Sequence, residues 1–530
     1  MASLASDGTP VLRLQDISKR FGALLANDAI TLDLGRGEVL ALLGENGAGK
    51  STLVSILFGH YLADAGHIEV FGKPLSPGDP AAALAAGIGM VHQHFTLADN
   101  LSVLDNVMLG TESMWRLRSA RSSARQALLE TAGRFGLQVN PDALIAELSV
   151  GERQRVEILK ALVPIGRRRG ARILILDEPT AVLTPGEAES LFGTLQQLVA
   201  QGLSVIFISH KLDEVLRVSQ RVAVLRAGRL VAALDTADAD KGRLAELMVG
   251  RPVEAPQRRK RELGGTVCSL QAATIASAHG RPALSGVNLD LRAGEIVAIA
   301  GVSGNGQQAL AELLFGQRAL DGGSVTLQGR ALRARPRDWI AAGVARVPED
   351  RQAVGVIGDL ALWENVVLER YATPTFASAG VLRRATAQAH ARMLIRRFDV
   401  RGAEGRGPDT PTRALSGGNM QKLILGRALA GDPSQHAAPT LIVADQPTWG
   451  LDIGAVAYVH QQLLDACAQG AALLLISEDL DEIFALADRI AVMHQGRLSE
   501  ARPAATWTLA EIGLAMSGGA AQAAEALHAD

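Results

Sequence analysis

Short apolar runs alternate with segments of helical periodicity along most of the chain. The runs Val39–Leu43, Ile173–Leu176 and Ala471–Ile476 are bounded by polar or charged residues, which is typical of buried strands in a parallel sheet. Between such runs lie segments with a helical pattern, among them Ser122–Phe135 and Ala385–Phe398. The alternation predicts an α/β fold with a mostly parallel sheet, in which these two helices belong to helical inserts.

The same order of features occurs twice. A glycine-rich loop that begins at Gly44 recurs at Gly301, and an acidic residue that ends an apolar run, Asp177, recurs as Asp445. A repeat over most of the sequence indicates a duplicated domain. Proline and clustered charge between the copies are typical of an exposed linker, and the Ala-rich end of the chain is typical of a frayed tail. We therefore predict a first domain at 1–250, a linker at 251–265, a second domain at 266–516 and a flexible tail at 517–530.

Composition and charge narrow the class of protein. Of 530 residues, 48% are hydrophobic and 20% are charged, which is a globular composition. The 53 Lys and Arg residues balance the 55 Asp and Glu residues, whereas nucleic-acid-binding domains are usually basic, so no nucleic-acid partner is expected. The two cysteines, Cys268 and Cys467, favour a reducing compartment. We expect a soluble chain, because we find neither a secretory signal nor a run of ~20 apolar residues.

The first glycine-rich loop has the pattern G-x4-G-K-[ST] of a phosphate-binding loop. It follows the apolar run Val39–Leu43 and precedes the helical segment Thr52–Phe58, which is the context that the motif requires. Its glycines let backbone N–H groups face phosphates, Lys50 supplies positive charge, and the Ser51 hydroxyl can bind Mg²⁺. A chance glycine-rich turn is the alternative. The expected nucleotide-binding residues of the loop are Gly44, Glu45, Asn46, Gly47, Ala48, Gly49, Lys50, Ser51 and Thr52.

Two adjacent carboxylates follow a buried strand in the first copy. The apolar run Ile173–Leu176 ends in Asp177 and Glu178. We expect Asp177 to hold Mg²⁺ directly or through water, and Glu178 to polarise the attacking water. Acidic residues also cap turns after strands, but the phosphate loop upstream favours the catalytic interpretation.

Two further motifs resemble the signature loop of the ATP-binding cassette (ABC) ATPases. They are Leu148–Gln154 in the first copy and Leu415–Gln421, with the sequence Leu-Ser-Gly-Gly-Asn-Met-Gln, in the second. The order of phosphate loop, glutamine loop, signature, carboxylate strand and histidine also matches that family, and the match covers nearly the whole chain. The resemblance implies two tandem nucleotide-binding domains, each with a phosphate-loop NTPase core and a helical subdomain, and ATP and Mg²⁺ as cofactors.

In that family two cassettes face each other head to tail. Each ATP lies between the phosphate loop of one cassette and the signature loop of the other. The resemblance therefore implies a site that combines the first phosphate loop with Ser416, Gly417 and Gly418 of the second copy. The first copy lacks an aspartate shortly after its carboxylate strand, but the second copy keeps Asp452, which would face the same site. A role in stabilising a turn is an equally good interpretation of Asp452.

The resemblance also assigns roles to three other residues of the first copy. It implies that Phe21 stacks on adenine, that Gln93 binds Mg²⁺ or water, and that His210 contacts the γ-phosphate. Packing in the core is an equally good interpretation of Phe21. The expected catalytic residues are thus Lys50, Gln93, Glu178 and His210, and the expected metal ligands are Ser51, Gln93 and Asp177.

The second copy lacks most of these chemical groups. Gln307 and Gln308 replace the lysine and serine of the phosphate loop, Gln446 replaces the glutamate, and Glu478 replaces the histidine. An amide cannot usefully accept a proton, so we predict one hydrolytic site and one degenerate site. The altered first signature, Ser149-Val150-Gly151, would face the degenerate site. The residues of the degenerate site are Gly301, Gly304, Gly306, Gln307, Gln308, Asp445, Gln446, Glu478, Ser149 and Gly151.

A fused pair of cassettes with a short linker and one degenerate site resembles the ATPase subunit of an ABC importer. The nucleoside-uptake branch is the most similar, on the stretches Val91–Phe95, Gly301–Gln307, Val347–Arg351, Gln446–Thr448 and Ser477–Ile483. The expected function is ATP hydrolysis that energises nucleoside uptake. Monosaccharide uptake is the alternative, and a soluble factor acting on ribosomes or DNA is a less favoured one.

The resemblance also implies a location and partners. We expect a peripheral protein at the cytoplasmic face of the cell membrane, bound to two integral membrane permease subunits. An extracytoplasmic substrate-binding lipoprotein or periplasmic protein would deliver the substrate. Because the chain already contains two cassettes, one chain per transporter is expected.

Overall fold

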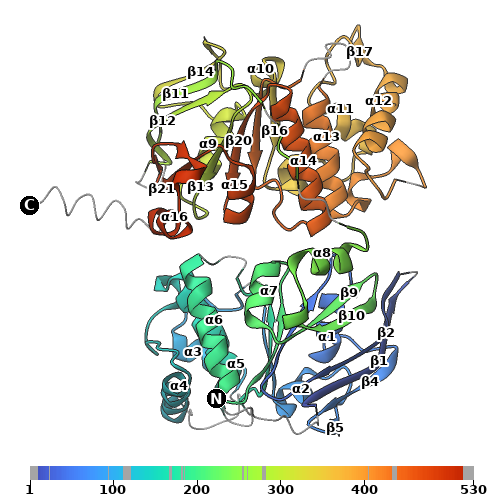
Figure 1. Cartoon of the computed structure of the whole chain (residues 1–530), viewed down its shortest axis with the longest axis vertical. Coiled ribbons are helices and arrows are strands. Elements are labelled where there is room, and N and C mark those ends of the chain that lie inside the picture. The colour runs from blue at the N-terminus through green and yellow to red at the C-terminus, as the bar shows by residue number, and fades with distance from the viewer. Residues whose placement is uncertain are drawn as a thin grey trace, which may run out of the picture. The chain divides into compact units, whose positions relative to one another are not determined.

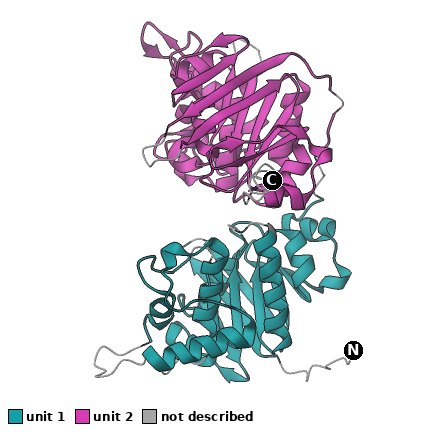
Figure 2. Ribbon diagram, turned by 90° about the vertical axis from the view of Figure 1, so that its left-hand side faces the viewer, with its two compact units in different colours: residues 1–253 teal, residues 254–530 magenta. Residues whose placement is uncertain are grey.

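The computed structural model describes residues 10–22, 24–92, 95–111, 121–165, 170–180, 183, 185–252, 256–259, 261–276, 282–403, 405–431 and 438–516. The chain divides into two compact units, residues 1–253 and 254–530 (Figure 2). Each unit contains one copy of the duplicated pattern. Within the described ranges, no helix is long and apolar enough to cross a membrane.

A six-stranded sheet forms the centre of the first unit (Figure 1). Its order is β10-β9-β3-β8-β7-β6, and all neighbours except the β10–β9 pair are parallel. Most of the side chains on the parallel strands are buried, as expected where helices cover both faces of a sheet. The strands are β3 (Val39–Leu43), β6 (Ile88–Val91), β7 (Ile173–Asp177), β8 (Ser204–Ile208), β9 (Arg221–Arg226) and β10 (Arg229–Asp235).

A second sheet of the first unit is antiparallel and has the order β2-β1-β4-β5. Its strands are β1 (Leu12–Phe21), β2 (Leu24–Leu34), β4 (Ala65–Val70) and β5 (Lys73–Pro74). Leu14 and Ile30 of this sheet share one hydrophobic core with Leu42 of the central sheet and Leu53 of helix α1. The helices are α1 (Lys50–Leu57), α2 (Pro80–Ala86), α3 (Val103–Met108), α4 (Arg121–Phe135), α5 (Val150–Leu162), α6 (Pro185–Ala200), α7 (Leu212–Val218) and α8 (Lys241–Val249).

The second unit repeats this arrangement. Its central sheet has the order β16-β19-β20-β13-β21-β22, with β23 also paired to β21, and its antiparallel sheet has the order β12-β11-β14-β15. The central strands are β13 (Ile296–Ala300), β16 (Val344–Val347), β19 (Leu441–Asp445), β20 (Ala472–Ser477), β21 (Arg489–His494), β22 (Arg497–Leu498) and β23 (Arg502–Pro503). The antiparallel strands are β11 (Thr266–Ile275), β12 (Leu284–Arg292), β14 (Gly322–Leu327) and β15 (Arg330–Ala331), and a short hairpin joins β17 (Ala377–Ser378) to β18 (Val381–Leu382).

The helices of the second unit cover its central sheet and form its helical insert (Figure 1). They are α9 (Gln307–Leu314), α10 (Pro336–Ala341), α11 (Leu362–Val367), α12 (Arg384–Arg397), α13 (Gly417–Ala430), α14 (Ile453–Ala468), α15 (Leu480–Leu486) and α16 (Leu509–Met516). The predicted α/β fold is therefore confirmed. The helices predicted at 122–135 and 385–398 are present as α4 and α12, within one residue at each end.

Part of the segment between the copies packs on the second unit. Arg258 donates hydrogen bonds to the carbonyl oxygens of Ala485 and Ala487, at the end of α15, over 3.2 and 2.9 Å. Arg261 forms an ion pair with Asp488, and its side chain is only 11% exposed. These arginines therefore belong to the surface of the second unit, although the sequence suggested a solvated linker. The predicted tail, 517–530, lies outside the described residues.

Candidate nucleotide-binding sites

The first phosphate loop joins the end of β3 to the start of α1, as the motif predicts. Gly49 has φ of 103° at the N-cap of α1, and a Cβ atom there would lie 2.4 Å from the carbonyl oxygen of Ala26, so only glycine fits. Lys50 is buried, and its Nζ donates to the carbonyl oxygens of Gly44 at 2.5 Å and Glu45 at 3.1 Å. The lysine thus lies across the loop, where its charge can meet a phosphate.

Two carboxylates and a histidine lie beside this loop. Burial, together with the charge of Glu178, raises the pKa of Asp177, and Lys50 opposes that shift. Burial also acts to raise the pKa of Glu178, but the hydrogen bond and charge of His210, with Lys50 and Lys211, outweigh it and lower the pKa. The Nδ1 atom of His210 lies 3.1 Å from Oε1 of Glu178. Glu178 is therefore held ionised, in contact with an imidazole.

The turn after β7 presents Glu178 in an unusual backbone conformation. Its φ is 46°, in the left-handed region that residues other than glycine rarely adopt, and its N–H donates to Ile208 O at 2.9 Å. The counterpart Gln446 has the same conformation, with φ of 47°, and donates to Ile476 O at 2.8 Å. The second unit has thus kept the strained turn and lost only the carboxylate.

The residues around the loop suit Mg²⁺ only in part. Asp177 and Ser51 offer hard oxygen ligands, and the raised pKa of Asp177 indicates a carboxylate that a cation would stabilise. The described residues hold no cluster of three or more His, Cys, Asp or Glu side chains suited to a metal. An ion there would therefore need phosphate and water oxygens to complete its shell, as is usual for Mg²⁺. Gln93, the third predicted ligand, lies outside the described residues.

Phe21 ends strand β1 and is 42% exposed. Tyr61 packs against it edge to face with ring centroids 5.4 Å apart, and the Lys19 ammonium lies 5.4 Å from the Phe21 centroid. Phe21 is thus not a core residue, and stacking on adenine stays the prediction for it. Sequence reasoning missed Tyr61, although an aromatic residue soon after α1 was a visible signal.

The two signature loops start helices in different ways. Ser149 caps α5 through a reciprocal pair with Glu152, in which each side-chain oxygen accepts the other residue's N–H, at 3.3 and 2.9 Å. Ser416 makes no such cap on α13, and its Oγ accepts a hydrogen bond from the Asn419 amide at 2.8 Å. The N-terminal turn of α13 is therefore not covered by its own serine.

Asp452 lies near the second signature within the same unit. Its carboxylate caps α14 by accepting the N–H of Ala455 at 2.7 Å, so the turn-stabilising role is present. A Cβ atom at Gly418 would lie 3.8 Å from Oδ2 of Asp452, which places the two next to each other. Whether these groups face the first phosphate loop depends on how the two units pair, and that pairing stays a prediction.

Sequence reasoning also missed Arg351, which lies beside the second signature. Its guanidinium donates to the carbonyl oxygen of Trp449, and Nη1 lies 3.3 Å from where a Cβ atom on Gly417 would be. Arg351 thus bonds to the loop after β19 and lies beside the signature turn. In the sequence, the stretch Val347–Arg351 indicates only a resemblance to the nucleoside-uptake branch and gives no sign of this contact.

The second phosphate loop is surrounded by negative charge. Burial, together with the negative charges of Glu349, Glu478 and Glu312, raises the pKa of Asp445 to about 7. Gln446 Oε1 accepts the N–H of Glu478 at 3.3 Å, in the place where the glutamate and histidine meet in the first unit. No lysine stands in this loop, because Gln307 replaces it. Gln307, Gln446 and Glu478 therefore follow the neighbouring strands β13, β19 and β20 of the second unit.

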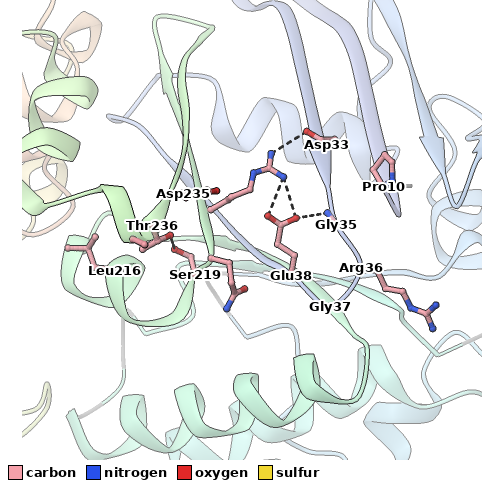
Figure 3. Close-up of a pocket in the computed structure, with 13 residues that line it drawn as sticks. Pro10, Asp33, Gly35, Arg36, Gly37, Glu38, Leu216, Ser219, Asp235 and Thr236 are labelled. Atoms are coloured by element: carbon pink, nitrogen blue, oxygen red, sulfur yellow. Dashed lines mark hydrogen bonds and ion pairs between the residues drawn. The ribbon is translucent and has the colours of Figure 1, made fainter. Parts of the chain in front are cut away.

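A cavity of about 780 Å³ lies elsewhere in the first unit (Figure 3). Glu38 on its wall precedes β3, and Arg221 begins β9, so the cavity lies at the opposite end of these parallel strands from Gly44. Arg221 forms ion pairs with Asp33 and Glu38, both at 3.2 Å. Figure 3 labels these two carboxylates and marks their interactions with dashed lines. These paired charges fasten the turn before β3 and offer no phosphate-binding loop, so we assign the cavity no part in nucleotide binding.

The strand, glycine-rich loop and helix, with a carboxylate at the end of the neighbouring strand, define a phosphate-loop nucleotide-binding protein. A sequence model of the family described as "ABC transporter" matches residues 27–181 and 284–448. The chain belongs to the ABC transporter family, and its cassettes are of the ATP-binding, ATPase type.

Curated relatives match almost the whole chain. The "Nucleoside import ATP-binding protein NupA" of Lactococcus lactis subsp. cremoris is 42% identical over 96% of this chain and 98% of its own length. The "Guanosine import ATP-binding protein NupO" of Bacillus subtilis is 42% identical over 96% and 97%. The "Glucose import ATP-binding protein TsgD13" of Haloferax volcanii is 43% identical over 96% of each chain.

A solved structure of an archaeal ribosome recycling factor, aABCE1, in complex with the ribosomal stalk protein aP1 is also similar. It has a TM-score of 0.58 over 92% of this chain and 90% of that chain, at 18% identity. The structural similarity shows that the two proteins share a fold. Because the sequence identity is so low, the similarity carries no information on function.

Proposed function

We propose that this chain is the ATP-hydrolysing subunit of an ABC importer that takes up nucleosides, with one hydrolytic and one degenerate nucleotide site. The observation that carries the proposal is the contact between Glu178 and His210 beside Lys50, in a chain whose second copy has Gln446, Glu478 and Gln307 at the same places. A base, an imidazole and a phosphate-binding cation are the groups that ATP hydrolysis requires.

Each side chain of the first site has a separate role in ATP hydrolysis. Lys50 binds the β- and γ-phosphates, and the backbone N–H groups of the loop hold them at the start of α1. Glu178, kept ionised, accepts a hydrogen bond from the attacking water and then its proton. His210 holds that carboxylate through Nδ1 and contacts the terminal phosphate with its other nitrogen. Mg²⁺, held by Ser51, Asp177 and Gln93, would neutralise charge on the phosphate oxygens.

The two units supply one complete site when they pair head to tail. The Ser416–Gly418 turn at the start of α13 offers N–H donors and the positive end of a helix dipole to the γ-phosphate. ATP then stabilises the closed pair, and hydrolysis with loss of phosphate allows it to open. The coupling to transport is a two-state equilibrium that nucleotide biases.

Nucleosides are the proposed substrate class because two relatives of 42% identity are named for nucleoside or guanosine import. A monosaccharide importer is the second candidate, and TsgD13, named for glucose import at 43% identity, favours it. The cassette residues do not touch the transported molecule, so the choice rests on the relatives alone.

The proposal implies partners and a location. Two integral membrane permeases would bind grooves near Gln93 and Glu349, and an extracytoplasmic binding protein would deliver the substrate. One double-cassette chain would serve each transporter, at the cytoplasmic face of the membrane. A soluble factor acting on ribosomes would instead sediment with them.

The decisive experiment is reconstitution of the chain with its permeases and binding protein in vesicles. ATP hydrolysis and uptake are measured with a panel of nucleosides and monosaccharides. Stimulation by nucleosides but not by sugars is expected. Stimulation by a sugar alone would select the second candidate, and sedimentation with ribosomes in place of co-purification with membrane proteins would refute both.

A further inference from the structure

The two phosphate loops of this chain share several backbone hydrogen bonds and the conformation of the glycine before the helix, so their side chains can be compared. The glycine before the helix has φ of 103° in the first loop and 117° in the second. The N–H of Ala48 bonds to Glu45 O at 3.0 Å, and that of its counterpart Asn305 bonds to Val302 O at 3.3 Å. Each of these two residues also accepts an N–H from the neighbouring β-turn, at 3.1 and 2.7 Å. Substitution has therefore left the shape of the second loop intact.

Gln307 uses both ends of its amide on its own loop. Nε2 donates to Val302 O at 2.9 Å, and Oε1 accepts the N–H of Asn305 at 3.1 Å. The side chain is 8% exposed, and a Cβ atom at Gly301 would lie 2.4 Å from Nε2. Lys50 has only donors, so it can bond to carbonyl oxygens of its loop but cannot accept a loop N–H. The glutamine thus adds a second acceptor to the Asn305 N–H, which also bonds to Val302 O, and ties the loop across by a bond that the lysine cannot make.

Asn305 adds a second set of bonds. Its Nδ2 donates to Val302 O at 2.9 Å, and its Oδ1 accepts the N–H of Gln495, in the turn between β21 and β22, at 2.9 Å. Alanine stands at this place in the first loop and can make neither bond. The second loop is therefore tied across its width and to the neighbouring strand turn by side chains of its own.

The negative charges around the second loop also disfavour a bound phosphate. Burial and the negative charges of Glu349, Glu478 and Glu312 raise the pKa of Asp445, and no loop lysine offsets these charges. Phosphate oxygens brought here would meet carboxylates of like charge in a partly buried setting, where such repulsion is weakly screened.

We propose that Asn305 and Gln307 close the second phosphate loop on itself, so that this site takes no nucleoside triphosphate and each chain binds a single ATP. The inference deepens the proposed function and rests on its assignment of the first loop as the ATP site. The second unit then contributes its signature turn and α13 to catalysis, while its own loop is a fixed structural element.

Equilibrium dialysis of the full chain with labelled Mg·ATP measures how many ATP molecules each chain binds, and so tests the proposal. All proteins carry Glu178→Gln so that ATP is not consumed. The parent variant is expected to bind one ATP per chain, and a further Lys50→Ala change is expected to abolish binding. In a third protein, Asn305→Ala, Gln307→Lys and Gln308→Ser are added to the parent variant, and binding of two per chain is expected. Thermal unfolding checks that each variant is folded.

The outcomes separate the two proposals. Two ATP per chain in the parent variant, or retained binding after Lys50→Ala, would overturn the closed second loop and leave the hydrolytic first site in place. No ATP in the parent variant would refute the first site, and with it the proposed function, while the exclusion at the second site would stand. A third protein that is folded but still binds one ATP would show that Asn305 and Gln307 are not what excludes nucleotide, and the inference would fail.

Discussion

The imidazole of His210 touches the carboxylate of Glu178, with Nδ1 and Oε1 3.1 Å apart. The two side chains come from the ends of neighbouring parallel strands, β7 and β8, whose register pairs Asp177 with Ile208. The same strands of the second unit, β19 and β20, bring Gln446 and Glu478 together with a different bond. Duplication has thus preserved the positions at the strand ends, while the chemistry at those positions has diverged.

Because Glu178 is a carboxylate and its counterpart Gln446 is an amide, substitutions at these two positions should affect ATP turnover unequally. Glu178→Gln removes the proton acceptor and should lower the turnover of ATP by ~10²–10⁴-fold. Gln446→Ala should change it little, because no base is lost. Phosphate release by the reconstituted transporter measures both. Comparable losses from the two substitutions would contradict the division into one hydrolytic and one degenerate site.

Substitution of the two signature serines should affect different properties: Ser149→Ala mainly the stability of the fold, and Ser416→Ala mainly the turnover of ATP. Ser149→Ala removes the N-cap of α5 and should cost about 1 kcal/mol of the unfolding free energy of the first unit. Ser416→Ala removes only a bond to Asn419, so its effect on stability should stay within about 0.5 kcal/mol. If Ser416 closes over the γ-phosphate, the second change should lower turnover by roughly tenfold or more, well beyond the first.

Urea unfolding and steady-state ATPase rates on the same two variants make the comparison. A larger loss of turnover from Ser149→Ala than from Ser416→Ala would indicate that the pairing of the units is not the one proposed.

Much of the first site could be predicted from the sequence because its parts are local. The phosphate loop and the carboxylates at the end of β7 are each fixed by a strand end followed by a turn, and apolar runs mark strand ends clearly. The bonds of Gln307 and Asn305 could not be predicted, because they depend on rotamers and on a turn almost 200 residues away. Arg351 escaped notice for the same reason: its contact at Trp449 joins segments that are distant in the sequence.

The raised pKa of Asp445 predicts how the unfolding free energy of the second unit depends on pH. Burial and three nearby carboxylates raise its pKa to about 7 in the folded unit, whereas the pKa of an unfolded aspartate is near its ordinary value of about 3.9. Between these values the folded state holds a proton that the unfolded state has released, so the unfolding free energy falls as the pH rises from about 4 to 7. Asp445→Asn removes the cost of ionising this buried carboxyl group. The substitution should therefore stabilise the second unit on the order of 2–4 kcal/mol at pH 8, and far less at pH 4.

Urea unfolding of the second unit at several pH values between 4 and 8 checks this, with the wild-type chain as reference. A variant whose unfolding free energy depends on pH as steeply as that of the wild type would show that Asp445 is not the group responsible.

The last prediction concerns Arg351, which bonds to the Trp449 carbonyl and lies against Gly417 at the start of α13. Removing the guanidinium breaks the bond to the loop after β19 and leaves space beside the signature turn, so the turn can shift. Misplacement of catalytic groups by about 1 Å can cost on the order of 10²-fold in rate. Arg351→Ala should therefore lower turnover by roughly 10- to 100-fold. Arg351→Lys should rescue little, because an ammonium lacks the planar fork that spans the two contacts.

Arg413→Ala is the matched control, since that arginine is 71% exposed and, among the described residues, forms its ion pair with the exposed Asp359. It should leave turnover unchanged, because exposed pairs contribute little. ATPase assays of the three variants, with KM measured separately from kcat, make the test. A fall confined to KM in Arg351→Ala, or full activity in Arg351→Lys, would show that the arginine binds nucleotide as a simple charge and does not position the signature turn.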